Sequence, residues 1–212
     1  LFALSQANGP TQQTTEQVPF TEHGQFSYGG VVEGGVYDSD ILSAPQPLYR
    51  QLTNNLPLSF NYSVDTSAED EQLTNVLGSY ELVAEISTGD GWKRTIKLQP
   101  ATRFAGDAFA TTTEIDLTAL DEALAVITEQ TGIGAGSYAI RVIARVSTNG
   151  LLAEAPIERT FQQSIQFRLT PLALQFDGAE ESLAFEATGP VSRDTIAPRT
   201  LEVPMLPISA PY

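Results

Sequence analysis

The sequence predicts a mainly β protein: an antiparallel β-sandwich of the immunoglobulin-like or jelly-roll type, with one amphipathic crossover helix. Apolar side chains recur at every second position in several segments, which is typical of half-buried strands. Only one stretch, near 118–131, has apolar residues at a helical period instead. The 212 residues suit one all-β domain or two small ones, and 42% of them are apolar, which is enough for a sizeable core.

The chain divides into three parts by composition. Residues 1–19 are rich in Gln, Thr and Ser and predict a linker or juxtamembrane segment. The sandwich is expected at 20–188, with regular alternation beginning near Gln25. Residues 189–212 contain several prolines, which cannot donate hydrogen bonds inside a sheet, so this part is predicted to be an extended tail or an edge strand.

Two β-hairpins are predicted on either side of the helix. In the first, alternating residues from Tyr80 onward are followed by a turn at 88–91 and a return strand. In the second, Asn149 and Gly150 are expected to form the tight turn, because both residue types tolerate positive φ angles. The return strand is expected at about 161–169.

The predicted helix has one apolar stripe, since large aliphatic side chains fall three or four residues apart. Thr118 and Asp121 have the spacing of a capping box at its start, and Gly132 is expected to end it in a left-handed conformation. We expect the helix to lie on the sheet or to cover one end of the sandwich. The stripe consists of Leu117, Leu120, Leu124 and Ile127.

The charge balance and the absence of cysteine exclude several classes of protein. The chain has 26 acids against 11 lysines and arginines, a formal charge of −15, which disfavours nucleic acids and anionic membrane surfaces. Without cysteine there are neither disulfides nor thiolate metal sites, which fits an exported prokaryotic protein. No apolar stretch is long enough to span a membrane. The apolar start at Leu1 predicts a processed end just outside a signal or anchor segment, or else an arbitrary cut.

No catalytic residues are predicted, and we expect the protein not to be an enzyme. His23, the single histidine, precedes the first predicted strand in polar sequence and is expected in an exposed loop. A serine triad would depend on it, and zinc would need further histidine or cysteine ligands. Lys93 and Lys97 are interpreted as charges that protect a sheet edge from pairing.

Two surface modifications or ligands are predicted. A loop with four carboxylates is the best candidate for calcium, which prefers oxygen ligands, although a solvated acidic turn is the alternative. No other cofactor is predicted. Asn61 begins an Asn-x-Ser sequon on the polar side of a strand, which predicts N-glycosylation. The candidate calcium ligands are Asp65, Glu69, Asp70 and Glu71.

Spaced aromatic residues and glycines in residues 18–176 resemble the DUF5305 family. That resemblance implies a membrane-anchored extracytoplasmic domain of archaea or bacteria, with a helix near each end and no assigned activity. It supplies no catalytic residues, and the anchor helices are absent from this sequence. The matching segments are Phe26-x-Tyr28, Val36-Tyr37-Asp38, Pro47-Leu48-Tyr49, Phe60-x-Tyr62, Gly78-x-Tyr80-x-Leu82, Gly91-Trp92, Phe104-x-Gly106, Asp116-Leu117 and Thr131-Gly132.

The expected function is that of a non-catalytic domain at the cell surface or envelope, with a structural or adhesive role. Its expected partners are other proteins or copies of itself, with the membrane reached only through anchor segments outside this sequence. Exposed strand edges near the proline-rich tail suit pairing by strand addition. The alternative is a glycan- or calcium-binding surface module, with an aromatic platform or a carboxylate cage at 65–71.

Overall fold

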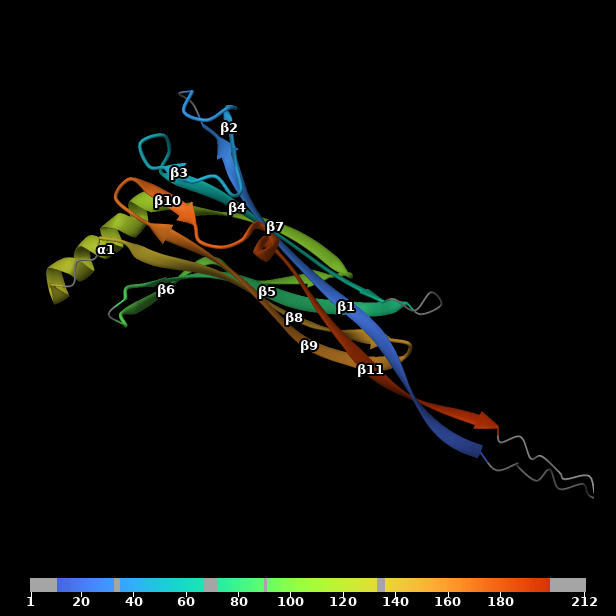
Figure 1. The fold of residues 1–212 in the computed structure, drawn as a ribbon. Coiled ribbons are helices and arrows are strands. Elements are labelled where there is room, and N and C mark those ends of the chain that lie inside the picture. The colour runs from blue at the N-terminus through green and yellow to red at the C-terminus, as the bar shows by residue number, and fades with distance from the viewer. Residues whose placement is uncertain (1–10, 33–34, 67–71, 90, 133–135, 199–212) are drawn as a thin grey trace, which may run out of the picture.

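The computed structural model describes residues 11–198, except for 33–34, 67–71, 90 and 133–135. In these residues, two antiparallel sheets pack face to face, and one α-helix lies at an end of the sandwich (Figure 1). This sandwich-like, mainly β architecture with a single helix confirms the predicted fold class.

Both sheets are built from antiparallel neighbours. The first has the order β11-β1-β4-β7, with β2 beside β1, and the second has the order β3-β10-β9-β8-β5-β6. A short 3-10 helix, Glu180–Leu183, precedes the last strand. The strands are β1 Thr11–Val31, β2 Ile41–Ser43, β3 Leu48–Tyr49, β4 Asn55–Thr66, β5 Leu73–Ser87, β6 Lys93–Ala105, β7 Ala108–Asp116, β8 Tyr138–Leu152, β9 Ala155–Leu169, β10 Ala173–Phe176 and β11 Ala184–Pro198.

The core lies between the sheets and is formed by alternate residues of the strands. In β4, Leu58, Phe60 and Tyr62 are all at most 2% exposed, while Asn61 between them is exposed. The inward positions of β8 and β9 face them with aliphatic and aromatic side chains. Because each large apolar side chain contributes about 1.5–3 kcal/mol when buried, the alternation predicted from the sequence is the main source of stability.

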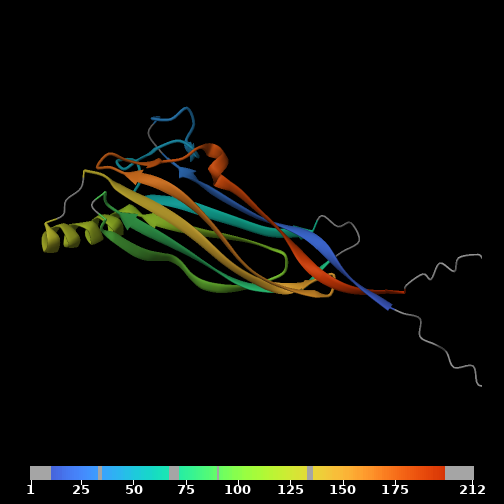
Figure 2. The ribbon, with the colours of Figure 1, turned by 60° about the horizontal axis from the view of Figure 1, so that its bottom comes forward.

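The first strand is much longer than the sequence predicts. Strand β1 begins at Thr11, so residues 11–19 are part of a strand, not a linker. It pairs with β11 from Thr11 opposite Pro198 to Gln25 opposite Ala184, whereas its pairing with β4 begins only at Phe20. The outer halves of β1 and β11 therefore form a two-stranded ribbon that projects from the sandwich, away from the helix (Figures 1 and 2).

The sequence predicts either an extended tail or an edge strand for residues 189–212, and the described part of this segment is an edge strand. Residues 189–198 belong to β11, which is an edge strand of the first sheet. Residues 1–10 and 199–212, which include the rest of both predicted terminal segments, lie outside the described residues.

Helix α1, Leu117–Thr131, connects β7 of the first sheet to β8 of the second and is therefore a crossover helix, as predicted. Its predicted capping box is wrong: the carboxylate of Asp116 accepts hydrogen bonds from the backbone N–H groups of Thr118, at 2.8 Å, and Ala119, at 3.0 Å. Gly132 ends the helix with φ of 69°, as expected. No helix among the described residues has the length and hydropathy of a membrane span.

Both predicted hairpins form, but the turn of the second lies elsewhere. Asn149 and Gly150 lie inside β8, opposite Glu158 and Ile157 of β9. The alternation continues to Leu152, which is fully buried, so the strand extends past the favourable turn residues. The chain reverses instead at 153–154, where both residues have positive φ.

This turn supplies a test of local strain. Glu154 is exposed and has φ of 65°, a region that costs most residues with a β-carbon about 1 kcal/mol. We expect Glu154→Gly to raise the free energy of unfolding by about 0.5–1 kcal/mol, measured by chemical denaturation. Glu154→Ala loses the same charge but keeps the β-carbon, so an equal gain in that variant would assign the effect to charge.

Candidate functional site

The single histidine lies in the middle of β1, so its predicted position in an exposed loop is wrong. His23 is 37% exposed; its Nδ1 is 3.2 Å from Glu186 Oε1 on β11 and its Nε2 is 3.5 Å from Asp65 Oδ2 on β4. The ring therefore bridges three strands on the outer face of the first sheet. Because both nitrogens face carboxylates, neither is directed at a nucleophilic serine as a catalytic triad requires.

The structure describes one of the four predicted calcium ligands. Asp65 is exposed and faces His23, while Glu69, Asp70 and Glu71 lie outside the described residues. In the part of the chain that the structure describes, no group of three or more His, Asp or Glu side chains is arranged to hold a metal ion. Calcium binding by the 65–71 loop therefore stays a prediction.

Asn61, the predicted glycosylation site, lies on the outer face of the first sheet and is exposed. With its neighbours His23 and Ser63 it lines an open hollow of about 460 Å³, whose floor is made of small residues, Gly24, Ala108 and Ala110. A glycan on Asn61 would extend over this hollow. Occupancy of the sequon stays a prediction.

A polar cluster that sequence reasoning missed lies inside the sandwich, where the ribbon enters it. Glu22 and Thr148 are each 1% exposed and come from opposite sheets. The hydroxyl of Tyr62 donates a hydrogen bond to Glu22 Oε1 at 2.7 Å, so Thr148, at 3.1 Å, must donate to the tyrosine oxygen. Arg159 of β9 places its Nε 3.7 Å from Glu22 Oε2.

The cluster joins the sheets, and Glu22, Tyr62 and Thr148 are closed to solvent, while the Arg159 side chain reaches the surface. Arg159 also lies over the ring of Phe20, 5.1 Å from its centroid. Burial raises the pKa of Tyr62 above its ordinary value, which keeps the hydroxyl protonated as a donor. With every member engaged by another, the cluster is a structural link between the sheets, because no substrate can reach it.

The sequence carried a signal for this cluster. Residues from Val18 to Tyr28 alternate, and Glu22 lies on the same phase as the buried Phe20 and Phe26. A first strand that begins near Gln25, as predicted from the sequence, leaves Glu22 outside the pattern. An acidic residue on the inward phase of a strand indicates a buried partner.

The Tyr62 hydroxyl offers a second test. Tyr62→Phe leaves Glu22 and Thr148 buried without this partner, and we expect it to lower the free energy of unfolding by about 1–3 kcal/mol, measured by denaturant titration. Tyr80→Phe is the matched control, since Tyr80 packs in the same aromatic cluster but its hydroxyl makes no hydrogen bond to another described residue. Equal losses in the two variants would contradict the role of the buried cluster.

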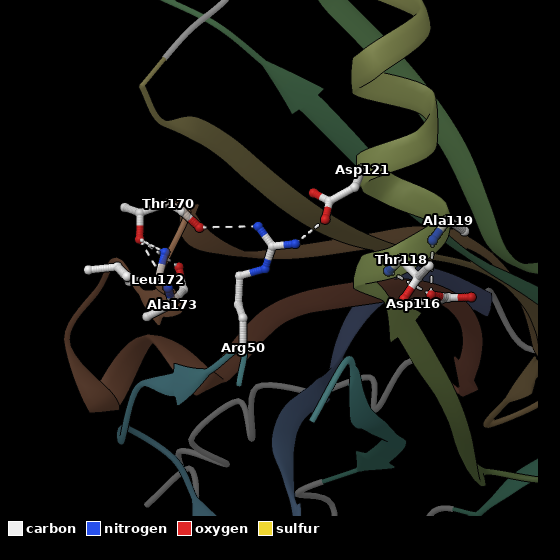
Figure 3. Close-up of polar contacts among 8 residues, drawn as sticks. All are labelled: Arg50, Asp116, Thr118, Ala119, Asp121, Thr170, Leu172 and Ala173. Atoms are coloured by element: carbon white, nitrogen blue, oxygen red, sulfur yellow. Dashed lines mark hydrogen bonds and ion pairs between the residues drawn. The ribbon is translucent and has the colours of Figure 1, made fainter. Parts of the chain in front are cut away.

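A second polar group holds the helix against the sandwich. The guanidinium of Arg50 contacts the carboxylate of Asp121 on α1 and lies 3.5 Å from the carbonyl oxygen of Thr170 (Figure 3). The Thr170 hydroxyl in turn accepts from the N–H of Ala173 at 3.1 Å. Asp121, predicted to cap the helix, instead anchors it to the loops at this end of the sandwich.

The cations of this acidic chain are concentrated on the outer face of the second sheet. The outward positions of β6, β5, β8 and β9 carry six of the eleven lysines and arginines but only three acids, a formal +3 on these four strands in a chain of −15, and Arg168 forms an ion pair at 3.2 Å with Asp177, which follows β10. We call it the cationic face. Its cations are Lys93, Lys97, Arg103, Arg141, Arg145 and Arg168, and its acids are Glu81, Glu85 and Glu158.

Some of these charges form ion pairs and others do not. Glu85 accepts from Arg141 at 2.8 Å and lies 3.2 Å from Lys93, and Glu81 accepts from Arg145 at 2.9 Å. Lys93 and Lys97 lie on β6, an edge strand, as predicted. Among the described residues, Lys97 and Arg103 have no acidic partner within ion-pair distance.

The Glu85 network makes stability depend on pH. Partial burial raises the pKa of this carboxyl, but the hydrogen bonds and charges of Lys93 and Arg141 outweigh it and hold the pKa below its ordinary value. The folded state is therefore favoured above the ordinary pKa, and this contribution is lost as pH falls through the lowered one. We expect Glu85→Gln to reduce the loss of stability on acidification, measured by thermal melts from neutral to acidic pH, and parallel profiles for both proteins would contradict it.

The comparisons with known proteins assign no family. No protein-family model matches the chain, and no curated protein matches it. A solved structure described as "Crystal structure of protein from Archaeoglobus fulgidus" aligns with 59% of this chain and 94% of its own, at 9% identity and a TM-score of 0.23. This likeness is too weak to carry an argument about function, and the resemblance to DUF5305 stays a prediction.

Proposed function

We propose that this is a non-catalytic domain displayed outside the cytoplasmic membrane, at a cell surface or envelope, with a structural or adhesive role. The observation that carries the proposal is the ribbon of β1 and β11, in which the chain enters and leaves the sandwich side by side (Figure 1). Such a ribbon holds the body away from whatever adjoins its two ends, which suits a displayed domain.

The ribbon is built to remain in solvent. Side chains at 14–17 are exposed, and the cross-strand contacts are polar: Arg193 donates to Glu16 at 2.6 Å and Gln17 donates to Ser192 at 2.8 Å. Seven residue pairs, from Thr11 opposite Pro198 to Gln17 opposite Ser192, lie beyond the buried Val18 and Val191 and extend it by about 23 Å at the usual rise of a strand. An isolated two-stranded ribbon is marginal by itself, so its order depends on continuity with the sheet.

The open edge of β11 is poorly suited to strand addition, so we propose contacts through the sheet faces instead. The carbonyl of Pro19 accepts from Thr66 on the β4 side, and its direct partner Pro190 must then face the open edge. Proline has no N–H, so the row of donors along this edge is interrupted in the middle. Natural sheets use proline at such positions to prevent edge-to-edge pairing.

The proposal that the domain is non-catalytic has its own support. Its one histidine is held between two carboxylates on an open sheet face, and the buried Glu22 cluster is closed to substrates. General acid–base catalysis needs a group that is free to exchange a proton with a bound substrate; both nitrogens of His23 lie beside carboxylates, and Glu22 is 1% exposed.

Display outside the membrane is tested by cysteine labelling, because these 212 residues contain no cysteine of their own. Ala119 is exposed on α1, and we expect Ala119→Cys in the full-length protein to react with a membrane-impermeant maleimide on intact cells. The readout is a mass shift on a denaturing gel before and after lysis.

Ala84→Cys is the matched control, since Ala84 is 2% exposed in the core and should react only after denaturation. Reaction of Ala119→Cys only after cell lysis would place the domain inside the cell and refute the proposal.

A further inference from the structure

A trough crosses the cationic face at right angles to its strands. Its floor is a row of directly paired residues in which Ser79 lies opposite both Arg103 and Ser147, and Ser147 lies opposite Thr160. These residues come from β6, β5, β8 and β9 in order. With strands about 4.8 Å apart, the row is about 15 Å long.

The trough is hollow because small side chains lie between larger ones. Two open hollows of about 580 and 180 Å³ meet here and share Ser79 and Ser147. Leu77 and Asn149 form one wall, and the ion pair of Glu81 with Arg145 lines the other side. Leu77 is 55% exposed, so this wall offers an apolar surface beside the hydroxyls.

The electrostatics of the trough favour an anion. Glu81 is neutralised by Arg145, whereas Arg103 is exposed and forms no ion pair with a described residue. Arginine presents a planar fork of donors that matches a carboxylate. At physiological ionic strength, charges interact over about 8 Å, so the attraction for a carboxylate lies at the Arg103 end of the trough, while Glu158, two residues from Thr160, lies beside the other end.

We propose that the trough binds an acidic oligosaccharide, one with uronate sugars. The serine and threonine hydroxyls and the Asn149 amide match sugar hydroxyls, Arg103 matches the carboxylate, and Leu77 matches the apolar face of a sugar ring. The inference rests on the proposed display outside the cell, where such polymers are met, and it gives the adhesive role a ligand.

An extended peptide fits the trough less well. The central strands β5 and β8 are hydrogen-bonded on both sides, so a chain lying across them finds no free backbone groups for strand addition. The floor therefore offers side-chain groups alone, three hydroxyls and the Arg103 guanidinium, which suits a ligand rich in hydroxyl groups that also bears a carboxylate.

The test uses isothermal titration calorimetry of the purified protein with trigalacturonic acid and with a neutral galactose trisaccharide. We expect the acidic trisaccharide to bind and the neutral one to bind at least about tenfold more weakly. Arg103→Gln should weaken acidic binding by about tenfold or more, since it removes a charge-assisted hydrogen bond. Ser147→Leu should abolish binding by filling the trough.

Arg94→Gln is the matched control: Arg94 is exposed on the same strand but on the opposite phase, and the change in net charge is the same. We expect its affinity to stay within about twofold of the parent. Equal weakening by Arg94→Gln and Arg103→Gln, no binding at millimolar trisaccharide, or equal binding of the neutral sugar would each overturn the proposal.

The acidic surface of a second copy of the chain is the competing occupant of the trough. Sedimentation velocity tests for this self-association. If the protein associates as its concentration rises, and Arg103→Gln removes that association, then the trough is a surface for self-assembly. That result would overturn the proposal of saccharide binding. A monomer at all concentrations supports it. Because these measurements use purified protein, their failure leaves cysteine labelling, and with it the proposed display, unaffected.

Discussion

The sandwich depends on the backbone hydrogen bonds that strand β1 makes with its two neighbouring strands. One long strand is hydrogen-bonded to β11 along one side and to β4 along the other, so it connects residues near the two ends of the described chain with the middle of the first sheet. The paired residues are far apart in sequence, so their hydrogen bonds can form only after the chain has closed large loops. Everything placed on β1, including the ribbon, Glu22 and His23, takes its position from this register.

The contact between β1 and the second sheet sets the spacing of the two layers. A β-carbon on Gly24 would lie 2.4 Å from Gln163 Oε1 and 2.6 Å from Phe161 Cζ, both on β9. Glycine allows this approach without displacing those two side chains, and Glu22, two residues earlier, lies within reach of Arg159. A single small residue in β1 therefore allows both the close packing and the buried polar link between the sheets.

Local patterns predicted the parts of the fold that local physics determines. The apolar stripe of α1, its left-handed end at Gly132 and the alternation in β4 each depend on neighbours in sequence, and each was found as predicted. The outer half of β1 was missed because its polar residues bury little, and a strand of that kind forms only against its distant partner β11. The turn at 153–154 was missed because continued burial through Leu152 outweighed the favourable turn residues at Asn149 and Gly150.

Of the candidate sites, the sequence placed Asn61 and the edge lysines correctly but not the trough. Ser79, Ser147 and Thr160 are unremarkable in sequence and become neighbours only through the register of two strand pairs, β5 with β8 and β8 with β9.

The distribution of charge changes what the composition of the chain implies. A net charge of −15 argues against anionic partners when the chain is treated as one average. The period of two along a strand, however, sorts alternate residues onto opposite faces, and in β6 and β8 it places Lys97, Arg103 and Arg145 together on the outside. Since screening limits the range of each charge to about 8 Å, a bound group samples one face and not the total. An acidic protein with a segregated cationic face thereby stays soluble through mutual repulsion while keeping one surface on which a carboxylate-bearing ligand is attracted.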